Sequence, residues 1–126
     1  MDKAKILTID DSLDMLFLEK AVLEREGFEV FTANNVVCAL EMIPNIPGLS
    51  LILCDVQMDV MNGLQFVERL EADHKLVFEN TPVVLVTALE AAPKAKVAGY
   101  IRKITDLNEF AARVRSFIFA PKPRLT

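Results

Sequence analysis

The chain has 126 residues, of which 52% are hydrophobic and 25% are charged, so it is long enough to bury one core without disulfides. Its net charge of −4 argues against nucleic acid as a direct partner, because phosphate binding calls for a basic face. The sequence contains no apolar run long enough to span a bilayer, and its N-terminus does not resemble a signal peptide. We therefore expect a cytoplasmic location and no membrane partner.

The N-terminal part of the chain alternates between strand and helix patterns. Residues 4–9 predict a short buried strand, followed directly by Asp10 and Asp11. A helix follows, which Asp11 or Ser12 can cap and Gly27 can end. Its apolar face is predicted to comprise Leu13, Leu16, Phe17, Ala21, Val22 and Leu23. Residues 28–32 predict a second strand, and the helix after it runs from Asn35 to Pro44.

The rest of the chain continues this alternation. Residues 51–55 form an apolar run that ends on Asp55, as expected for a strand buried on both faces. A helix follows Gly63 and fades near His74, and residues 75–81 are predicted to be a loop. Residues 82–88 and 97–101 predict the last two strands. The final helix begins at Thr105 or Asp106 and ends before Pro121.

This order predicts an α/β fold with a central parallel sheet of five strands and helices on both faces. One unit is unusually short. Only about ten residues separate Thr87 from the fifth strand, whereas a parallel crossover normally needs a dozen or more. Because Pro93 also interrupts this segment, we expect the fourth crossover helix to be shortened or missing.

Polar residues gather at the carboxyl ends of the predicted strands. Asp10 and Asp11 follow the first strand, Asp55 the third, Thr87 the fourth and Lys103 the fifth. Parallel strands bring these ends to one edge of the sheet, where open α/β folds place their ligands. Neighbouring carboxylates need a cation to remain charged, and all-oxygen ligands suit Mg²⁺. Lysine and threonine opposite them complete a place for a phosphoryl group.

In this arrangement the chain resembles the CheY-like receiver domain of two-component response regulators. The matching residues, in the family's order, are Asp10, Asp11, Asp55, Thr87 with Ala88, Tyr100 and Lys103. The resemblance implies a flavodoxin-like, doubly wound sheet with strand order 2-1-3-4-5. It covers nearly the whole chain, so we expect a receiver domain over residues 1–120. Residues 121–126 then form a tail or the start of a linker.

The resemblance also implies a metal and a phosphoacceptor. Asp55 would be the residue that accepts a phosphoryl group from the phosphohistidine of a histidine kinase. Asp11 would bind Mg²⁺ directly, Asp10 would act mainly through a bound water, and the backbone carbonyl of Gln57 would be a further ligand.

The same resemblance implies a switch. Lys103 would pair with the phosphoryl oxygens, Thr87 would hydrogen-bond one of them, and Tyr100 would rotate inward, so that a local charge change alters protein contacts. The expected partners are a histidine kinase or phosphotransfer protein and a downstream protein or fused output domain. The chain is expected to be a signalling domain and not an enzyme, apart from self-catalysed phosphotransfer and dephosphorylation.

Two residues depart from the family's pattern. Asp59 stands where most receivers have proline, which places an additional acid in the loop after Asp55. Ile104 stands where the family has a proline joined to the lysine by a cis bond. A cis bond before isoleucine would cost about 3 kcal/mol, so we predict a trans bond and some displacement of Lys103 or of the loop after it.

Two alternative functions remain open on the sequence. One is a protein-interaction module that keeps the fold but does not depend on phosphorylation, which the two departures and the short fourth unit favour. The other is a phosphatase of the haloacid dehalogenase type, whose nucleophile motif is Asp-x-Asp. Gln57 stands at the second acidic position of that motif, which argues against this function.

Overall fold

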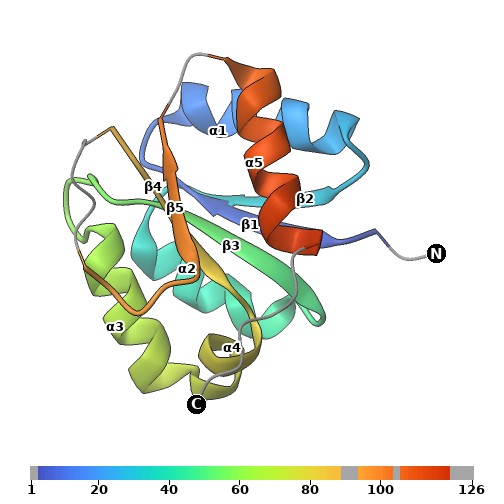
Figure 1. Cartoon of the computed structure of the whole chain (residues 1–126). Coiled ribbons are helices and arrows are strands. Elements are labelled where there is room, and N and C mark those ends of the chain that lie inside the picture. Colours follow the sequence, from blue (N-terminus) through green and yellow to red (C-terminus); the bar gives the residue numbers. More distant parts are fainter. Residues whose placement is uncertain (1–2, 89–93, 104–105, 120–126) are drawn as a thin grey trace.

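The computed structural model describes residues 3–88, 94–103 and 106–119, which contain one sheet of five parallel strands (Figure 1). The strands are β1 (Lys5–Ile9), β2 (Glu29–Ala33), β3 (Leu49–Asp55), β4 (Val83–Thr87) and β5 (Gly99–Arg102). They lie in the order β2-β1-β3-β4-β5, and every neighbouring pair is parallel. The predicted strand order of a flavodoxin-like sheet is therefore confirmed.

Helices cover both faces of this sheet. They are α1 (Leu13–Arg25), α2 (Val36–Met42), α3 (Gly63–Asp73), α4 (Lys75–Asn80) and α5 (Leu107–Phe119), with a short 3₁₀ helix, η1 (Ile43–Asn45), after α2. Figure 1 shows α1 and α5 on one face, and α2, α3 and α4 on the other. The polypeptide thus forms three layers with the sheet in the middle.

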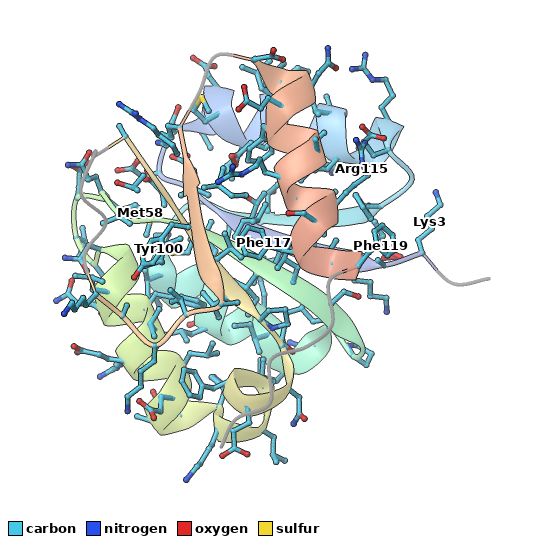
Figure 2. The ribbon with its side chains drawn as sticks, viewed as in Figure 1. Lys3, Met58, Tyr100, Arg115, Phe117 and Phe119 are labelled. Atoms are coloured by element: carbon cyan, nitrogen blue, oxygen red, sulfur yellow. The ribbon has the colours of Figure 1, made fainter. Side chains whose placement is uncertain are left out.

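Two apolar cores lie on the two faces of the sheet, because successive side chains of a strand point to opposite faces. In β1, Ile6 belongs to the core under α1 and α5, whereas Leu7 and Ile9 belong to the core under α2 and α3. Tyr100 and Phe117 lie on opposite sides of β5, one against each core (Figure 2). Burial on both faces explains why the central strands read as unbroken apolar runs.

The buried face of α1 differs from the predicted one. Leu16, Val22 and Leu23 are buried as expected, but Leu13 and Phe17 are 68% and 74% exposed, and Ala21 is exposed as well. The fourth buried residue of the helix is Glu19, an acid that was not part of the predicted apolar face. The stripe therefore runs through positions 16, 19, 22 and 23, which is also a helical spacing.

The prediction that residues 75–81 form a loop is wrong, because Lys75–Asn80 is a short helix, α4. Its Val77 and Phe78 pack against the core under α2 and α3, and the Asn80 side chain donates a hydrogen bond to the Leu76 carbonyl oxygen over 2.7 Å. A single amphipathic turn carries too few residues for its period to be read. Tertiary packing decides its conformation.

The connection from β4 to β5 contains no helix among its described residues, which are Ala88 and residues 94–98. Instead, Ala95 and Val97 pack against the core, and Lys96 forms an ion pair with Glu71 of α3 over 3.1 Å. This agrees with the expectation of a shortened or missing crossover helix. The predicted trans bond at Ile104 and the predicted stop at Pro121 fall outside the described residues.

Within the described part of the chain, every helix is too short or too polar to cross a membrane.

Candidate functional site

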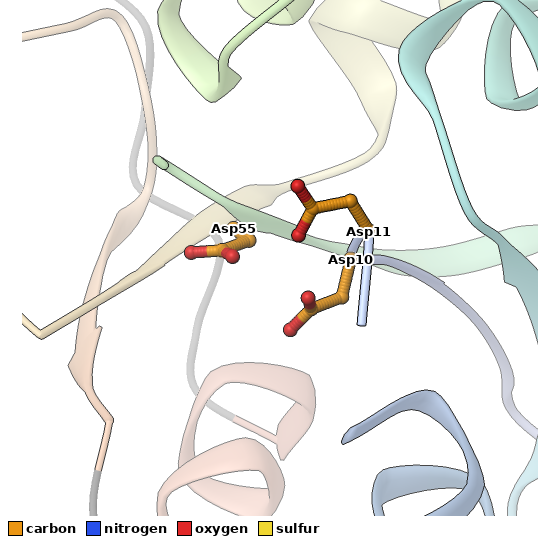
Figure 3. A group of neighbouring side chains, drawn as sticks. All are labelled: Asp10, Asp11 and Asp55. Atoms are coloured by element: carbon orange, nitrogen blue, oxygen red, sulfur yellow. The ribbon is translucent and has the colours of Figure 1, made fainter. Parts of the chain in front are cut away.

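Three carboxylates meet at the carboxyl edge of the sheet, where the sequence predicted them (Figure 3). Asp10 and Asp11 directly follow β1, and Asp55 is the last residue of the adjacent strand β3. One ligand oxygen from each of the three lies within 4.8 Å of the others. Asp10 and Asp55 are 2% and 3% exposed, whereas Asp11 is exposed, so the acidic cluster (Asp10, Asp11 and Asp55) opens to solvent on one side.

Backbone N–H groups fix each carboxylate of the acidic cluster. Ser12 donates to Asp10 Oδ1 over 2.9 Å, and Gln57 donates to Asp55 Oδ1 over 3.3 Å. Asp59 donates to Asp11 Oδ2 over 3.3 Å. The loop after Asp55 is in turn tied to α3, since the N–H of Gly63 donates to the Val56 carbonyl oxygen over 3.0 Å.

Lys103 brings a positive charge to the cluster from the end of β5. Its Nζ lies 2.9 Å from Asp55 Oδ2 and 3.4 Å from Asp10 Oδ2. The backbone N–H of Lys103 donates to the Thr87 carbonyl oxygen over 2.7 Å, which extends the pairing of β4 with β5. Lys103 therefore lies in the site although Ile104 follows it, and the other expected change, a displaced loop after Lys103, falls outside the described residues.

The charges of the site perturb one another. Burial raises the pKa of Asp55, and the negative charge of Asp10 adds to this, although the hydrogen bond from Lys103 opposes it. Burial lowers the pKa of Lys103, but the hydrogen bond from Lys103 to Asp55 and the charge of Asp10 outweigh burial, so the net pKa is raised. One ammonium faces three carboxylates, which leaves the acidic cluster short of positive charge.

The other predicted site residues lie around this cluster. Thr87 is buried at the end of β4, next to Val86, which is the register partner of Asp55. Tyr100 of β5 is half-buried against the core under α2 and α3. Gln57 lies in the exposed loop after Asp55. The fold brings all of them to the carboxyl half of the sheet.

Asp59 contributes to the site through its backbone. Its side chain is exposed, while its N–H holds the Asp11 carboxylate. Proline has no N–H and could not make this contact. The departure from the family's pattern thus adds a donor to the site, which the sequence signalled only as an additional acid.

Glu19 is the charged residue near the site that the sequence analysis missed. It is 3% exposed, and its Oε1 accepts a hydrogen bond from Thr8 Oγ1 over 2.9 Å. Burial raises the pKa of Glu19 to about 7, against the opposing hydrogen bond from Thr8. Its spacing of three residues from both Leu16 and Val22 was the signal that places it on the buried face.

The donor set fits a hard divalent cation. Two buried carboxylates and one exposed carboxylate offer oxygen atoms within 4.8 Å, and the exposed side leaves room for water. Mg²⁺ is bound in this way, through one or two carboxylates and several waters.

Comparisons with known proteins agree with this geometry. A family model described as the response regulator receiver domain matches residues 6–115. The chain is 34% identical over 119 residues to the transcriptional regulatory protein CrdR of Helicobacter pylori, a match that covers 90% of this chain and 54% of that protein. It is 31% identical to the transcriptional regulatory protein CpxR of Escherichia coli, over 90% of this chain and 49% of that protein. The chain thus spans about half the length of these relatives.

Solved structures share the fold. The chemotaxis protein CheY4 of Vibrio cholerae matches with a TM-score of 0.82 and 24% identity, over 92% of this chain and 99% of that chain. The response regulator TrrA of Thermotoga maritima, solved in complex with Mg²⁺ and BeF, matches with a TM-score of 0.76 and 24% identity, over 90% of this chain and 98% of that chain. With the family model and the sequence relatives, the chain belongs to the receiver domains of two-component response regulators.

Proposed function

We propose that this receiver domain accepts a phosphoryl group on Asp55 in a cation-dependent reaction, and that the change in charge alters its contacts with other proteins. The observation that carries the proposal is the convergence of three carboxylates within 4.8 Å, with Lys103 Nζ 2.9 Å from Asp55. A carboxylate cluster with one ammonium has the composition expected for a phosphoryl site.

Asp55 is the nucleophile in this proposal. Its carboxylate lies at the end of a central strand, held by the N–H of Gln57 on one oxygen and by Lys103 on the other. A P–O bond forms to this carboxylate while the P–N bond of a phosphohistidine breaks, and the bonding electron pair stays on the imidazole nitrogen of the donor. The product is an acyl phosphate on Asp55.

The residues that would hold Mg²⁺ are Asp11 directly, Asp10 through water, Asp55, and the backbone carbonyl of Gln57. When bound, the ion neutralises negative charge on the carboxylates and on the transferring phosphoryl group. Asp11 is exposed, whereas Asp10 is buried and already lies 3.4 Å from Lys103 Nζ, which supports a direct role for Asp11.

Lys103, Thr87 and Tyr100 carry the response to phosphorylation in this proposal. Lys103 transfers its contact from the carboxylate to the phosphoryl oxygens, and the Thr87 hydroxyl hydrogen-bonds another of them. Tyr100 then moves inward. The support is their placement: Thr87 ends β4, Tyr100 lies in β5 and Lys103 directly follows β5, on the side of the sheet next to Asp55.

The partners follow from the family. A histidine kinase or a phosphotransfer protein would supply the phosphoryl group, in the cytoplasm, to a receiver spanning residues 1–120. The sequence relatives CrdR and CpxR are transcriptional regulatory proteins about twice as long as the matched region, so an output domain or a separate downstream protein would read the switch. Apart from promoting its own phosphorylation and dephosphorylation, the domain would not act as an enzyme.

The test is intact-mass spectrometry after incubation with Mg²⁺ and a small acyl-phosphate donor. We expect a gain of one phosphoryl mass that is lost when Mg²⁺ is chelated and in the Asp55→Asn variant. Mass detection suits this chain because it contains no tryptophan for a fluorescence assay. If the wild-type protein folds and binds Mg²⁺ but gains no mass, the chain is a phosphorylation-independent interaction module.

A further inference from the structure

Glu19 is an ionisable group on the buried side of the proposed phosphoryl site, and the reaction proposed above does not use it. It lies on α1 between Leu16 and Val22, with 3% of its surface exposed. Its Oε1 accepts a hydrogen bond from the neutral hydroxyl of Thr8, and within the described part of the chain Glu19 forms no ion pair. A buried carboxylate with so little compensation favours its protonated form.

The strand geometry places Glu19 close to the acidic cluster without making it a ligand. Thr8 lies in β1 and Asp10 directly follows the strand, two residues later, so both side chains point to the face covered by α1 and α5. Glu19 bonds Thr8 on that face, one strand repeat before Asp10. A change of charge at the acidic cluster therefore acts on Glu19 through the protein interior, where screening by water is weak.

Charged groups at the ends of three neighbouring strands act on the carboxyl group of Glu19. Asp10 after β1 and Asp55 at the end of β3 disfavour its negative charge, and Lys103 after β5 favours it. The buried residues of α5, which also covers this face, are Phe110, Ala111 and Val114, and these carry no charge. With burial, these groups raise the pKa of Glu19 to about 7, near the physiological range.

We propose that Glu19 is a proton site linked to the acidic cluster, so that a divalent cation bound by Asp10, Asp11 and Asp55 drives the proton off Glu19. This inference rests on the proposed function only in requiring that the cluster binds a cation. The cation adds positive charge, which stabilises the ionised carboxylate of Glu19. Linkage is reciprocal, so an ionised Glu19 strengthens cation binding by the same factor.

The linkage makes cation affinity depend on pH. Below the titration midpoint of the Glu19 carboxyl the cation must displace a proton, and above it Glu19 is already ionised and attracts the cation. Cation affinity therefore rises with pH across the interval between the cation-bound and cation-free midpoints of Glu19, which ends near pH 7. A coupling of ordinary size would make this rise about five- to tenfold. The cation affinity of the site would then depend on pH through Glu19, a residue that does not bind the cation.

The experiment measures the Mg²⁺ dissociation constant by NMR titration from pH 5.5 to 8.5 for three proteins: wild type, Glu19→Gln and Glu24→Gln. Glu24 is an exposed acid on the same helix and serves as the matched control. We expect the wild type and the Glu24 variant to bind Mg²⁺ about five- to tenfold more tightly at the upper end. The Glu19 variant should lose that part of the pH dependence. Equal pH dependence in all three proteins would overturn the inference.

A direct readout follows the side-chain carboxyl ¹³C shift of Glu19 with and without Mg²⁺. Its midpoint should lie near 7 without the ion and fall when the ion is added. Thr8→Val removes the hydroxyl donor, so it should raise the Glu19 midpoint and move the pH dependence upward, without changing any charge. A midpoint near the ordinary value of 4.5, or one that Mg²⁺ does not move, contradicts the linkage.

These outcomes separate the inference from the proposed function. If Asp55 is phosphorylated but Mg²⁺ leaves Glu19 unchanged, only the linkage is wrong. If Mg²⁺ displaces the proton but Asp55 gains no phosphoryl mass, the proposed function is wrong and the linkage stands. Absence of Mg²⁺ binding by the wild type contradicts both.

Discussion

At the scale of single residues, the site is a balance between buried carboxylates and one ammonium. Lys103 contacts both Asp55 and Asp10, and its hydrogen bond opposes the effect of burial on the pKa of Asp55. The sequence located these residues correctly because strand ends converge in a parallel sheet. The Asp59 N–H on Asp11 could not be predicted, because a backbone contact across a loop leaves no mark in the residue pattern.

Lys103→Ala should slow the phosphorylation of Asp55 by about a hundredfold, since it removes the ammonium nearest to the reacting carboxylate. It should also raise the pKa of Asp55 further. A time course of intact mass and the carboxyl ¹³C shift of Asp55 measure the two effects. Lys96→Ala, which removes an exposed lysine paired with Glu71, is the control and should change neither. An unchanged rate in the Lys103 variant would exclude its proposed role.

Glu19 makes stability depend on pH. Its pKa is raised from 4.5 to about 7, so between these values the folded chain keeps a proton that the unfolded chain has lost. Wild-type stability therefore falls as pH rises through this interval. The unfolding free energy of Glu19→Gln minus that of the wild type should therefore rise by up to about 3 kcal/mol from pH 4.5 to pH 7.5. Urea unfolding at several pH values tests this, and a constant difference would mean that Glu19 titrates normally.

At the scale of elements, α3 supports the end of β3. The N-cap Asn62 and Gln65 form a reciprocal capping box, which fixes where α3 begins. At Gly63 the helix approaches β3 so closely that a Cβ would lie 2.7 Å from the Asp55 carbonyl oxygen and 3.1 Å from Val56 Cα. The sequence predicted a helix after Gly63 but not the closeness of its approach to β3.

Gly63→Ala should destabilise the domain by about 1–3 kcal/mol, because backbone atoms of β3 must move to admit the methyl group. Urea unfolding gives the free energy, and Glu68→Ala on the exposed side of α3 is the control, with a change within about 0.5 kcal/mol. Equal stabilities of the two variants would show that α3 is free to shift away from β3.

The short helix α4 depends on packing more than on its own sequence. Phe78 is partly buried against the core, while Leu76, two residues earlier, is 75% exposed. Phe78→Ala should therefore cost about 2 kcal/mol of unfolding free energy, and Leu76→Ala less than about 0.5 kcal/mol. Thermal unfolding of the pair tests this. Similar losses from both changes would mean that local helix propensity decides the conformation of this segment.

At the scale of the whole molecule, the residue pattern specified the fold class and the edge that carries the site, and the resemblance to receiver domains implied the strand order. The fold class and the edge follow from long-range regularities: unbroken apolar runs for buried strands, and acids at their ends. The errors were local. Leu13 and Phe17 were assigned to the buried face of α1 although they are exposed, and residues 75–81 were assigned to a loop. In both cases several helical spacings or conformations fit a few residues equally well, and only tertiary contacts choose among them.

The site that results combines a solvent-open acidic cluster, a lysine that bridges two of its carboxylates, and a buried acid behind it. Binding of a cation should therefore stabilise the folded domain, because the cluster exists only in the folded state. Addition of Mg²⁺ at a hundred times its dissociation constant should raise the unfolding free energy by about 2.7 kcal/mol. Asp11→Asn should reduce this gain, and an undiminished gain would place the ion elsewhere.

The most direct test of the central claim is to locate the phosphoryl group. Borohydride reduction of the phosphorylated protein converts an acyl-phosphorylated aspartate to homoserine, which tandem mass spectrometry assigns to a position in the chain. We expect the modification at residue 55 alone. Modification at the exposed Asp59, or at Asp11, would contradict the assignment of Asp55 as the phosphoacceptor.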